Sequence, residues 1–314
     1  MISKRSLFAV GLTLALAGAG AAAAQDSTSP PGEGSGSTVD HSKLEALQKD
    51  FATGPEVTEA CLSCHTEAAG QVKASIHWSW DYEHPETGQD LGKNNVVNSY
   101  CVAVAANEPR CTSCHVGYGW DDMSQPPPSA DAAVDCLVCH DKTDTYAKIP
   151  AGAGKPFGKE VKEGAVTNMG KPAKPVDLKL VAQSVGQPDR DNCGNCHFYG
   201  GGGDNVKHGD LSSAMHNPTE DIDVHMASDG LNFTCNECHV SDKHQWHGSR
   251  YNVTAKDTEG APLPGKRHDV ATCESCHDTE PHDSLTLIGF KLNSLRDKIA
   301  CQTCHIPEYA KGGV

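Results

Sequence analysis

The sequence has few of the residues from which protein cores are usually built. Of its 314 residues, 37% are hydrophobic and 5% are aromatic. After residue 24 it contains no apolar run long enough to cross a bilayer, so an integral membrane segment is not expected in the mature chain. Positive charge is scarce too, because 26 lysines and arginines stand against 41 aspartates and glutamates, for a net charge of −15. That balance argues against a nucleic-acid partner.

Cysteine, by contrast, is frequent and regularly placed. Fourteen of the 15 cysteines fall in seven Cys-x-x-Cys-His motifs, the attachment signature of c-type haem. The motifs are Cys61-Cys64-His65, Cys111-Cys114-His115, Cys136-Cys139-His140, Cys193-Cys196-His197, Cys235-Cys238-His239, Cys273-Cys276-His277 and Cys301-Cys304-His305. Two thiols three residues apart lie on one side of a helical turn, where they can bond the two haem vinyl groups. The histidine returns to that face, under the iron.

Three other uses of paired cysteines fit the motifs less well. Zinc ribbons use CxxC pairs, but they require no histidine immediately after the second cysteine. Thioredoxin-like redox motifs occur singly beside a βαβ pattern, which is not visible here. A disulfide framework leaves the seven motif histidines without a role. The repeated histidine therefore predicts seven covalently attached haem c groups.

The first 24 residues predict an export signal. A basic start and an apolar stretch lead to an A-x-A cleavage site at Ala22-Ala23-Ala24. A retained anchor is the alternative, since residues 7–24 are nearly long enough to span a bilayer, but their Gly/Ala-rich second half is weakly hydrophobic. Residues 25–40 have the composition of a flexible linker. We therefore expect a periplasmic or extracellular protein with one multihaem domain over residues 41–314.

The expected fold is mainly α with extensive irregular loops, built around a packed haem array. Residues 41–314 provide about forty residues for each motif, which is too few for each haem to lie in a conventional protein core of its own. Three helices are predicted. The first is capped by Asp40 and contains Leu44, Leu47 and Phe51, and the second is capped by Thr58, carries the first motif and continues towards His77. The third contains Leu292, Leu295 and Ile299 and leads into Cys301. The Pro/Gly-rich stretches 124–130 and 149–175 are predicted loops.

The histidines outside the motifs bear on the choice between a wire and an enzyme. An iron with two histidine ligands is closed and suits electron transfer, whereas an open or labile position can bind substrate. Ten histidines lie outside the motifs, enough to close seven irons. The favoured distal ligands are His77, His216, His225 and His268, followed by His208, His244, His247 and His282. His41 and His84 read as surface residues, and Met123, Met169, Met215 and Met226 as loop or packing residues.

Long stretches between the motifs resemble one family of multihaem cytochromes. These stretches are ASIHWSW (74–80), NEPRCTSCHVGYGW (107–120), VDCLVCHD (134–141), NCGNCHFYGGGGDNVKHGDL (192–211), DVHMASDGLNFTC (223–235) and CQTCHIP (301–307). Together they are similar to the octahaem tetrathionate reductases, whose haem arrangement is related to that of pentahaem nitrite reductases and hydroxylamine oxidoreductases. The resemblance runs from about residue 58 to the end of the chain.

The resemblance implies a division of labour among the haems. Most are bis-histidine relays, while the haem on Cys111, Cys114 and His115 has a lysine as its distal ligand, which matches Lys207. Such an amine binds iron only when it is deprotonated. Asp204 matches the family's active-site carboxylate, and Cys101, the one cysteine outside the motifs, matches its unpaired thiol. The residues alone leave simpler readings open: a solvated loop lysine, a turn aspartate and a buried small hydrophobe.

The number of motifs departs from the family. The family has eight haems, whereas this sequence has seven CxxCH motifs and no CxxxCH or CxxCK motif for an eighth. The chain also ends at Val314, where the resemblance implies a further C-terminal portion. We therefore expect either a truncated chain or a seven-haem variant. The residues assigned to the lysine-ligated haem are all present in either case.

Two functions follow as hypotheses. The first is a periplasmic reductase, in which a small anionic sulfur or nitrogen compound (tetrathionate, nitrite or hydroxylamine) is reduced at the Lys207-ligated haem. The second is a non-catalytic electron conduit with every iron closed by protein ligands. Hydroxylamine oxidation is weaker, because nothing in the sequence indicates the tyrosine–haem crosslink that relatives use for it. Redox partner proteins, either quinol-linked or soluble cytochromes, are expected for both functions.

Overall fold

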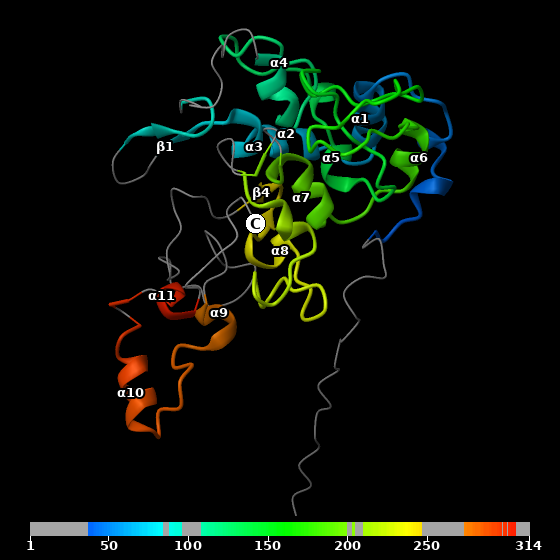
Figure 1. Ribbon diagram of the computed structural model, residues 1–314. Coiled ribbons are helices and arrows are strands. Elements are labelled where there is room, and N and C mark those ends of the chain that lie inside the picture. The colour runs from blue at the N-terminus through cyan, green and yellow to red at the C-terminus, as the bar shows by residue number, and fades with distance from the viewer. Residues whose placement is uncertain are drawn as a thin grey trace, which may run out of the picture. The chain divides into compact units, whose positions relative to one another are not determined.

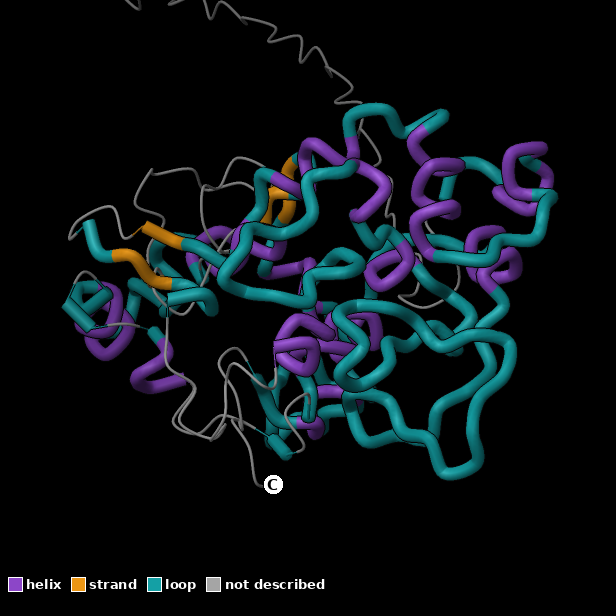
Figure 2. The backbone as a smooth tube through the Cα atoms, turned by 90° about the horizontal axis from the view of Figure 1, so that it is seen from above, coloured by secondary structure: helices purple, strands orange, loops and turns teal. Residues whose placement is uncertain are grey.

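Short helices joined by long loops make up most of the chain (Figures 1 and 2). The computed structural model describes residues 37–83, 88–95, 108–199, 203–204, 210–246, 273–296, 298–299 and 301–305. The α-helices are α1 (Gly54–Leu62), α2 (Ala68–Lys73), α3 (Ile76–Ser79), α4 (Glu108–Cys111), α5 (Leu137–His140), α6 (Leu178–Gln183), α7 (Arg190–His197), α8 (Cys235–Cys238), α9 (Glu274–His277), α10 (Leu287–Asn293) and α11 (Gln302–His305). The 3-10 turns are His41–Lys43, Glu45–Leu47, Thr112–Cys114, Asp131–Ala133 and Ser213–His216.

Strands are few and short in the described residues. β1 (Tyr82–Glu83) pairs with β2 (Asp90–Leu91), and β3 (Ser241–Asp242) pairs with β4 (Gln245–Trp246), each pair antiparallel. The Pro/Gly-rich residues between α5 and α6, all of them described, contain no helix or strand, as predicted for a loop. The helix-rich, sheet-poor part of the prediction therefore agrees with the structure.

The N-terminal helices differ in their limits from the predicted ones. Asp40 does cap a turn, because its carboxylate accepts the Ser42 amide at 3.1 Å. Leu44 is extended, however, so two 3-10 turns replace a continuous helix. α1 begins at Gly54 and is capped by Thr53. Thr58, predicted as a cap, lies buried inside α1, where its hydroxyl donates to the Val134 carbonyl at 2.6 Å.

The first helix also ends earlier than predicted, and the last predicted helix is divided. α1 stops at Leu62, and α2 and α3 cover the remaining path towards His77. At the other end of the chain, α10 stops at Asn293 and α11 begins at Gln302, so Leu295 and Ile299 lie between two helices. The apolar spacing there was real, but spacing alone does not fix where a helix ends.

The apolar core is concentrated in the first two thirds of the described chain. α1 contributes Val57, α5 contributes Leu137 and α6 contributes Val181, each no more than 1% exposed. Val134, also 1% exposed, joins them from the loop before α5. This core holds the first, second and third motifs on one framework, because the segments that carry them also contribute its side chains.

The residues around α10 are different in kind. Leu285, Leu287 and Ile288 are 97%, 90% and 73% exposed, and Phe290 is 66% exposed. Two motifs flank these residues, one in α9 and one in α11. Apolar surface of this density is normally covered by another group. In the described residues no helix is both long and apolar enough to cross a membrane.

Candidate haem sites

Each described motif folds into a helical turn, as the attachment chemistry requires. In the first, third, fifth, sixth and seventh motifs the histidine amide donates to the carbonyl of the first cysteine, at 2.8–3.2 Å. α7 carries the fourth motif, and an Asp189–Asn192 capping box starts that helix. The second motif is tighter, because the His115 amide donates to Thr112 in a 3-10 turn. The turn brings both thiols and the imidazole of each motif to one side.

Five motif histidines face a second histidine ring from elsewhere in the chain. The pairs and their ring-centroid distances are His65 with His41 at 6.3 Å, His140 with His244 at 6.4 Å, His197 with His77 at 6.4 Å, His277 with His225 at 5.9 Å and His305 with His282 at 5.9 Å. Two imidazoles on opposite sides of one metal ion, each with a metal–nitrogen bond of about 2.1 Å, have centroids roughly 6 Å apart. The paired rings therefore fit a six-coordinate haem iron.

The hydrogen bonds of these rings support the same fit. His140 directs Nδ1 at the Gly186 carbonyl, 2.8 Å away, and His244 directs Nδ1 at Gln71 Oε1, also 2.8 Å away. At the pair nearer the C-terminus, His282 Nδ1 lies 3.0 Å from Asn293 Oδ1. An Nδ1–H that donates to oxygen leaves the Nε2 lone pair for a metal, which is the usual arrangement of a ligating histidine.

Burial keeps several of these rings neutral. Desolvation lowers the pKa of His77 to about 4, and the nearby His197 and His239 lower it further in the same direction. Burial likewise lowers the pKa of His140 and of His244. Only a neutral imidazole has a lone pair for iron. These histidines therefore present metal-binding nitrogen at ordinary pH.

Contacts between cysteines show which motifs lie side by side. The Cys61 thiol lies beside the Cys136 thiol, and the Cys193 thiol lies beside the Cys235 thiol. Cys196 Sγ lies 3.7 Å from the Cys114 carbonyl oxygen. The first motif therefore adjoins the third, the fourth adjoins the fifth, and the second adjoins the fourth.

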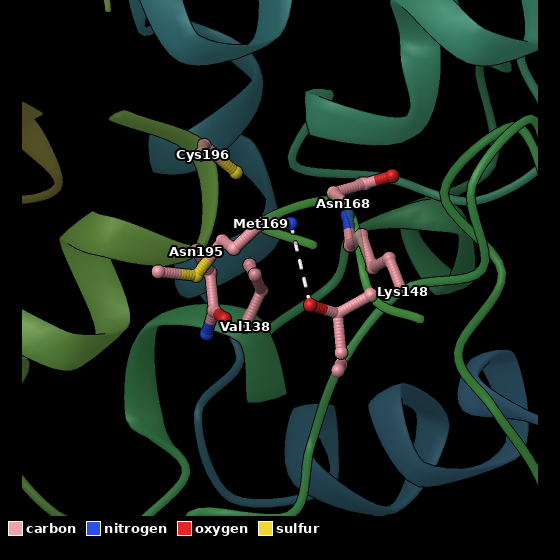
Figure 3. Close-up of a pocket in the computed structure, with 8 residues that line it drawn as sticks. Val138, Lys148, Asn168, Met169, Asn195 and Cys196 are labelled. Atoms are coloured by element: carbon pink, nitrogen blue, oxygen red, sulfur yellow. Dashed lines mark hydrogen bonds between the residues drawn. The ribbon is translucent and has the colours of Figure 1, made fainter. Parts of the chain in front are cut away.

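The second motif has distinct surroundings. His115 is 0% exposed, and its ring contacts within the described residues are with Trp78, Trp80 and Trp120, at centroid distances of 4.7, 5.5 and 4.9 Å. Its Nε2 lies 2.9 Å from the Trp78 carbonyl, while burial lowers its pKa to about 3. No described histidine ring takes the opposite position that the five paired rings have. A small pocket lies nearby, between Lys148 and Cys196 (Figure 3).

Several predicted site residues lie outside the described residues. These are Lys207, Cys101, His208, His247 and His268, and also His84. Asp204 is described, and its two carboxylate oxygens accept the Ser213 amide and hydroxyl, each at 2.8 Å. The carboxylate therefore caps the 3-10 turn Ser213–His216.

Two histidines have positions that the sequence did not suggest. His216, a favoured distal ligand, has Nδ1 2.7 Å from Asp191 and Nε2 3.3 Å from Lys171 Nζ, so both ring nitrogens contact side chains. His41, read as a surface residue, instead stacks opposite His65 with an angle of 13° between the rings. The Asp40 cap was the signal that could have found His41, because it starts ordered structure at that residue.

The chain is similar to several known proteins. The family model "cytochrome c7 and related cytochrome c" matches residues 218–306, and "cytochrome c554 and c-prime" matches residues 60–141. An octahaem cytochrome c from Shewanella oneidensis has a similar structure, with a TM-score of 0.64 and 42% identity over 86% of this chain and 53% of that one. An uncharacterized protein from Archaeoglobus fulgidus is 24% identical over 269 residues, 73% of this chain and 88% of its own length.

The motifs, the paired rings and these matches define the class. The protein is a multihaem c-type cytochrome, and the prediction of covalently bound haem c is confirmed. The chain spans about half the length of the octahaem cytochrome that it resembles in structure.

Proposed function

We propose that the protein is an exported multihaem reductase of the octahaem tetrathionate reductase type. Its bis-histidine haems serve as relays, and the haem on Cys111, Cys114 and His115, with Lys207 as distal ligand, is the reducing site. The substrate is a small oxidised sulfur or nitrogen anion, such as tetrathionate or nitrite, or hydroxylamine. The signal-like first 24 residues support export, and the acidic chain suits basic or haem-rich redox partners.

One observation carries the proposal. Five motif histidines face a second histidine at 5.9–6.4 Å, whereas His115 is enclosed by three tryptophans. Rings already paired favour closed irons, which suit electron transfer. The second and fifth motifs are not among these five, and of them the second has its histidine fully buried whereas His239 of the fifth is exposed, so we assign the other ligand to the second motif. The octahaem cytochrome at 42% identity supports a chain that carries many haems.

The assigned residues have separable roles in this proposal. Bound haem would supply an iron that accepts electrons one at a time and could bind a substrate atom in exchange for a labile distal ligand. Lys207 would hold that distal position as a neutral amine, and the positive charge that attracts an anion would come from the ferric iron. Asp204, held by Ser213, stands three residues away and can transfer protons, which reductive cleavage consumes. Cys101 supplies a thiol that can contact a sulfur substrate.

The second candidate function is a closed electron conduit. The five paired histidines favour it, because they would close five of the seven irons in the low-spin state that suits electron transfer. Electron paramagnetic resonance of the holoprotein, with and without nitrite or cyanide, separates the two functions. A reductase shows a changed signal for one haem, whereas an unchanged spectrum would identify a conduit.

The lysine assignment has its own test. Lys207→Met is expected to remove most reduction of tetrathionate and hydroxylamine while all seven attachments remain, as counted by pyridine haemochrome absorbance. Lys179→Met, a lysine of α6 on the surface, is the matched control and should leave turnover unchanged. Cys101→Ser should keep the haem content and alter turnover. Unchanged turnover in Lys207→Met would remove that residue from the site.

A further inference from the structure

A buried ion pair joins the segments that carry the second and third motifs. Lys148 Nζ lies 3.0 Å from Asp135 Oδ2, and the two side chains are 3% and 0% exposed. In every other ion pair among the described residues both side chains are at least 23% exposed. A buried pair pays a large desolvation cost, and an apolar replacement of the same shape is often no less stable. Stability alone therefore gives a weak reason for this pair.

Hydrogen bonds hold the carboxylate in place. Asp135 Oδ1 accepts the Tyr118 hydroxyl at 2.8 Å, the Tyr146 hydroxyl at 2.9 Å and the Val138 amide at 3.1 Å. The two tyrosine oxygens are 3.1 Å apart. Both hydroxyls are buried, and their protonated forms donate to the carboxylate. The anion thus has a fixed position and a fixed set of donors.

Each charge is attached to one motif. The Lys148 ammonium also donates to the carbonyl of His115, the motif histidine surrounded by tryptophans. Asp135 directly precedes Cys136, and its bond from Val138 fixes the first turn of α5, which ends at His140. The cluster of Asp135, Lys148, Tyr118 and Tyr146 therefore reaches the ligand-bearing turns of two motifs. A charge fixed in a low-dielectric interior acts strongly on a nearby redox centre.

We propose that the Asp135–Lys148 pair is a charge-setting element that fixes the reduction potentials of the haems on the second and third motifs. Both residues are positioning residues, since they act through the His115 carbonyl and the α5 turn. Removing the cation leaves a buried anion, which stabilises ferric iron and lowers the potential. Removing the anion leaves a buried cation, which stabilises ferrous iron and raises it. The proposal concerns potentials and stands whichever substrate the protein reduces.

Redox titration of the seven-haem holoprotein at about pH 7 tests this element, with absorbance and electron paramagnetic resonance as the readouts. Lys148→Met should shift one or two of the components to lower potential, and Asp135→Asn should shift the same components to higher potential. The double variant should return them towards the wild-type values. Opposite shifts that cancel are the signature of charge, because loosened packing would move both single variants in one direction.

Two further variants complete the design. Lys159→Met is the matched control, because Lys159 pairs with Asp177 at 3.1 Å with both side chains exposed, and it should leave every potential unchanged. Tyr146→Phe keeps both charges and removes one donor from the carboxylate, so it should give a smaller downward shift even where the charge variants fold poorly. Unchanged potentials in Tyr146→Phe and in any folded charge variant, or equal shifts in Lys159→Met, would overturn the proposal.

Discussion

At the scale of single residues, the groups that contact the two ring nitrogens of a histidine decide whether one nitrogen is left to bind iron. His244 uses Nδ1 for Gln71 and turns its ring towards His140. His216 has the same side chain, yet its two nitrogens contact Asp191 and Lys171. Only the first arrangement leaves a nitrogen directed at a motif histidine. Sequence position alone could not separate these two residues.

His244 and His216 therefore form a matched pair for a ligand test. His244→Ala should open one iron, because the opposite ring of His140 then has no partner, and about one haem in seven should become high-spin. His216→Ala should leave the spin state unchanged. Absorbance near the high-spin charge-transfer band and electron paramagnetic resonance measure both. A high-spin signal in His216→Ala alone would reverse the assignment.

The buried tyrosines predict a dependence of stability on alkaline pH. Burial and then the charge of Asp135 raise the pKa of Tyr118 and of Tyr146 well above the ordinary value. Both tyrosines contribute fully to the free energy of unfolding below about pH 10, the ordinary tyrosine pKa. The contributions are lost as the pH rises above that value, because the unfolded chain then releases protons that the folded chain retains. The free energy of unfolding should fall by about 1.4 kcal/mol per pH unit for each tyrosine.

Denaturant unfolding of the wild type and of Tyr146→Phe between about pH 9 and 11 checks this dependence. The variant should show a shallower slope than the wild type, since one of the two tyrosines no longer contributes. Equal slopes would contradict the buried, protonated state of Tyr146.

At the scale of elements, α7 organises the loop that follows the 3-10 turn Ser213–His216. Arg190, 8% exposed at the first residue of α7, donates to the carbonyls of Met226 and Phe233 at 2.9 and 2.6 Å. It also donates to Asn232 Oδ1 at 3.2 Å. His225 directly precedes the first of these acceptors, and its carbonyl accepts the Phe233 amide at 2.9 Å. The helix of the fourth motif thus positions a histidine that faces the sixth.

Arg190→Gln should therefore disturb a haem on a different motif from its own. Loss of a buried charged donor to several acceptors is expected to cost about 2–4 kcal/mol in the free energy of unfolding. The haem on Cys273 and Cys276 should become partly high-spin, since His225 is no longer held opposite His277. Denaturant unfolding and resonance Raman spectra measure the two effects.

The control for Arg190 is Arg110→Gln, which removes a single hydrogen bond at 3.3 Å to Asn168. It should cost less than about 1 kcal/mol and leave the sixth-motif haem low-spin. Arg190→Lys keeps the charge but loses the planar fork of donors, so it should recover only part of the loss. A fully low-spin Arg190→Gln protein would show that the loop needs no anchor.

At the scale of the whole molecule, the two ends of the described chain depend on haem to different degrees. Residues 44–185 include an apolar core of their own, with Val57 and Leu137 buried to 1% exposure or less. Residues 273–305 include Leu285 and Leu287, which lie between two motifs and are 97% and 90% exposed. Bound haem is the apolar group that this end of the chain has available. Its folding should therefore be coupled to haem attachment.

Haem removal tests that coupling. When the chain is produced without haem attachment, amide hydrogen exchange in α10 and α11 should be nearly unprotected, whereas α1 and α6 should keep measurable protection. Mass spectrometry of peptic fragments from the haem-free and haem-loaded proteins gives the comparison. Equal protection of α10 in both forms would show that its exposed leucines need no haem.

Local patterns in the sequence predicted the attachment chemistry and part of the fold. A CxxCH motif occupies one helical turn, so its thiols and imidazole meet without any distant contact, and the Asp40 cap was visible for the same reason. The mainly α, loop-rich class followed from composition and from the spacing of the motifs. The limits of the helices did not follow from the sequence, because the helical turns that end at Leu44 and Asn293 are set by contacts in the folded chain.

The sequence by itself therefore determined that this chain binds haem c covalently at CxxCH turns. Only the tertiary structure decided which distant groups meet at those turns. His140 and His244 are far apart in sequence, and Asp135 is 17 residues from the Tyr118 that donates to it. Lys148 stood at the edge of a predicted loop and gave no sign of its buried partner. The physical reason is the sequence range of the contacts. Haem attachment needs only the residues of one helical turn, whereas iron ligation and ion pairing need residues that the folding of the chain brings together.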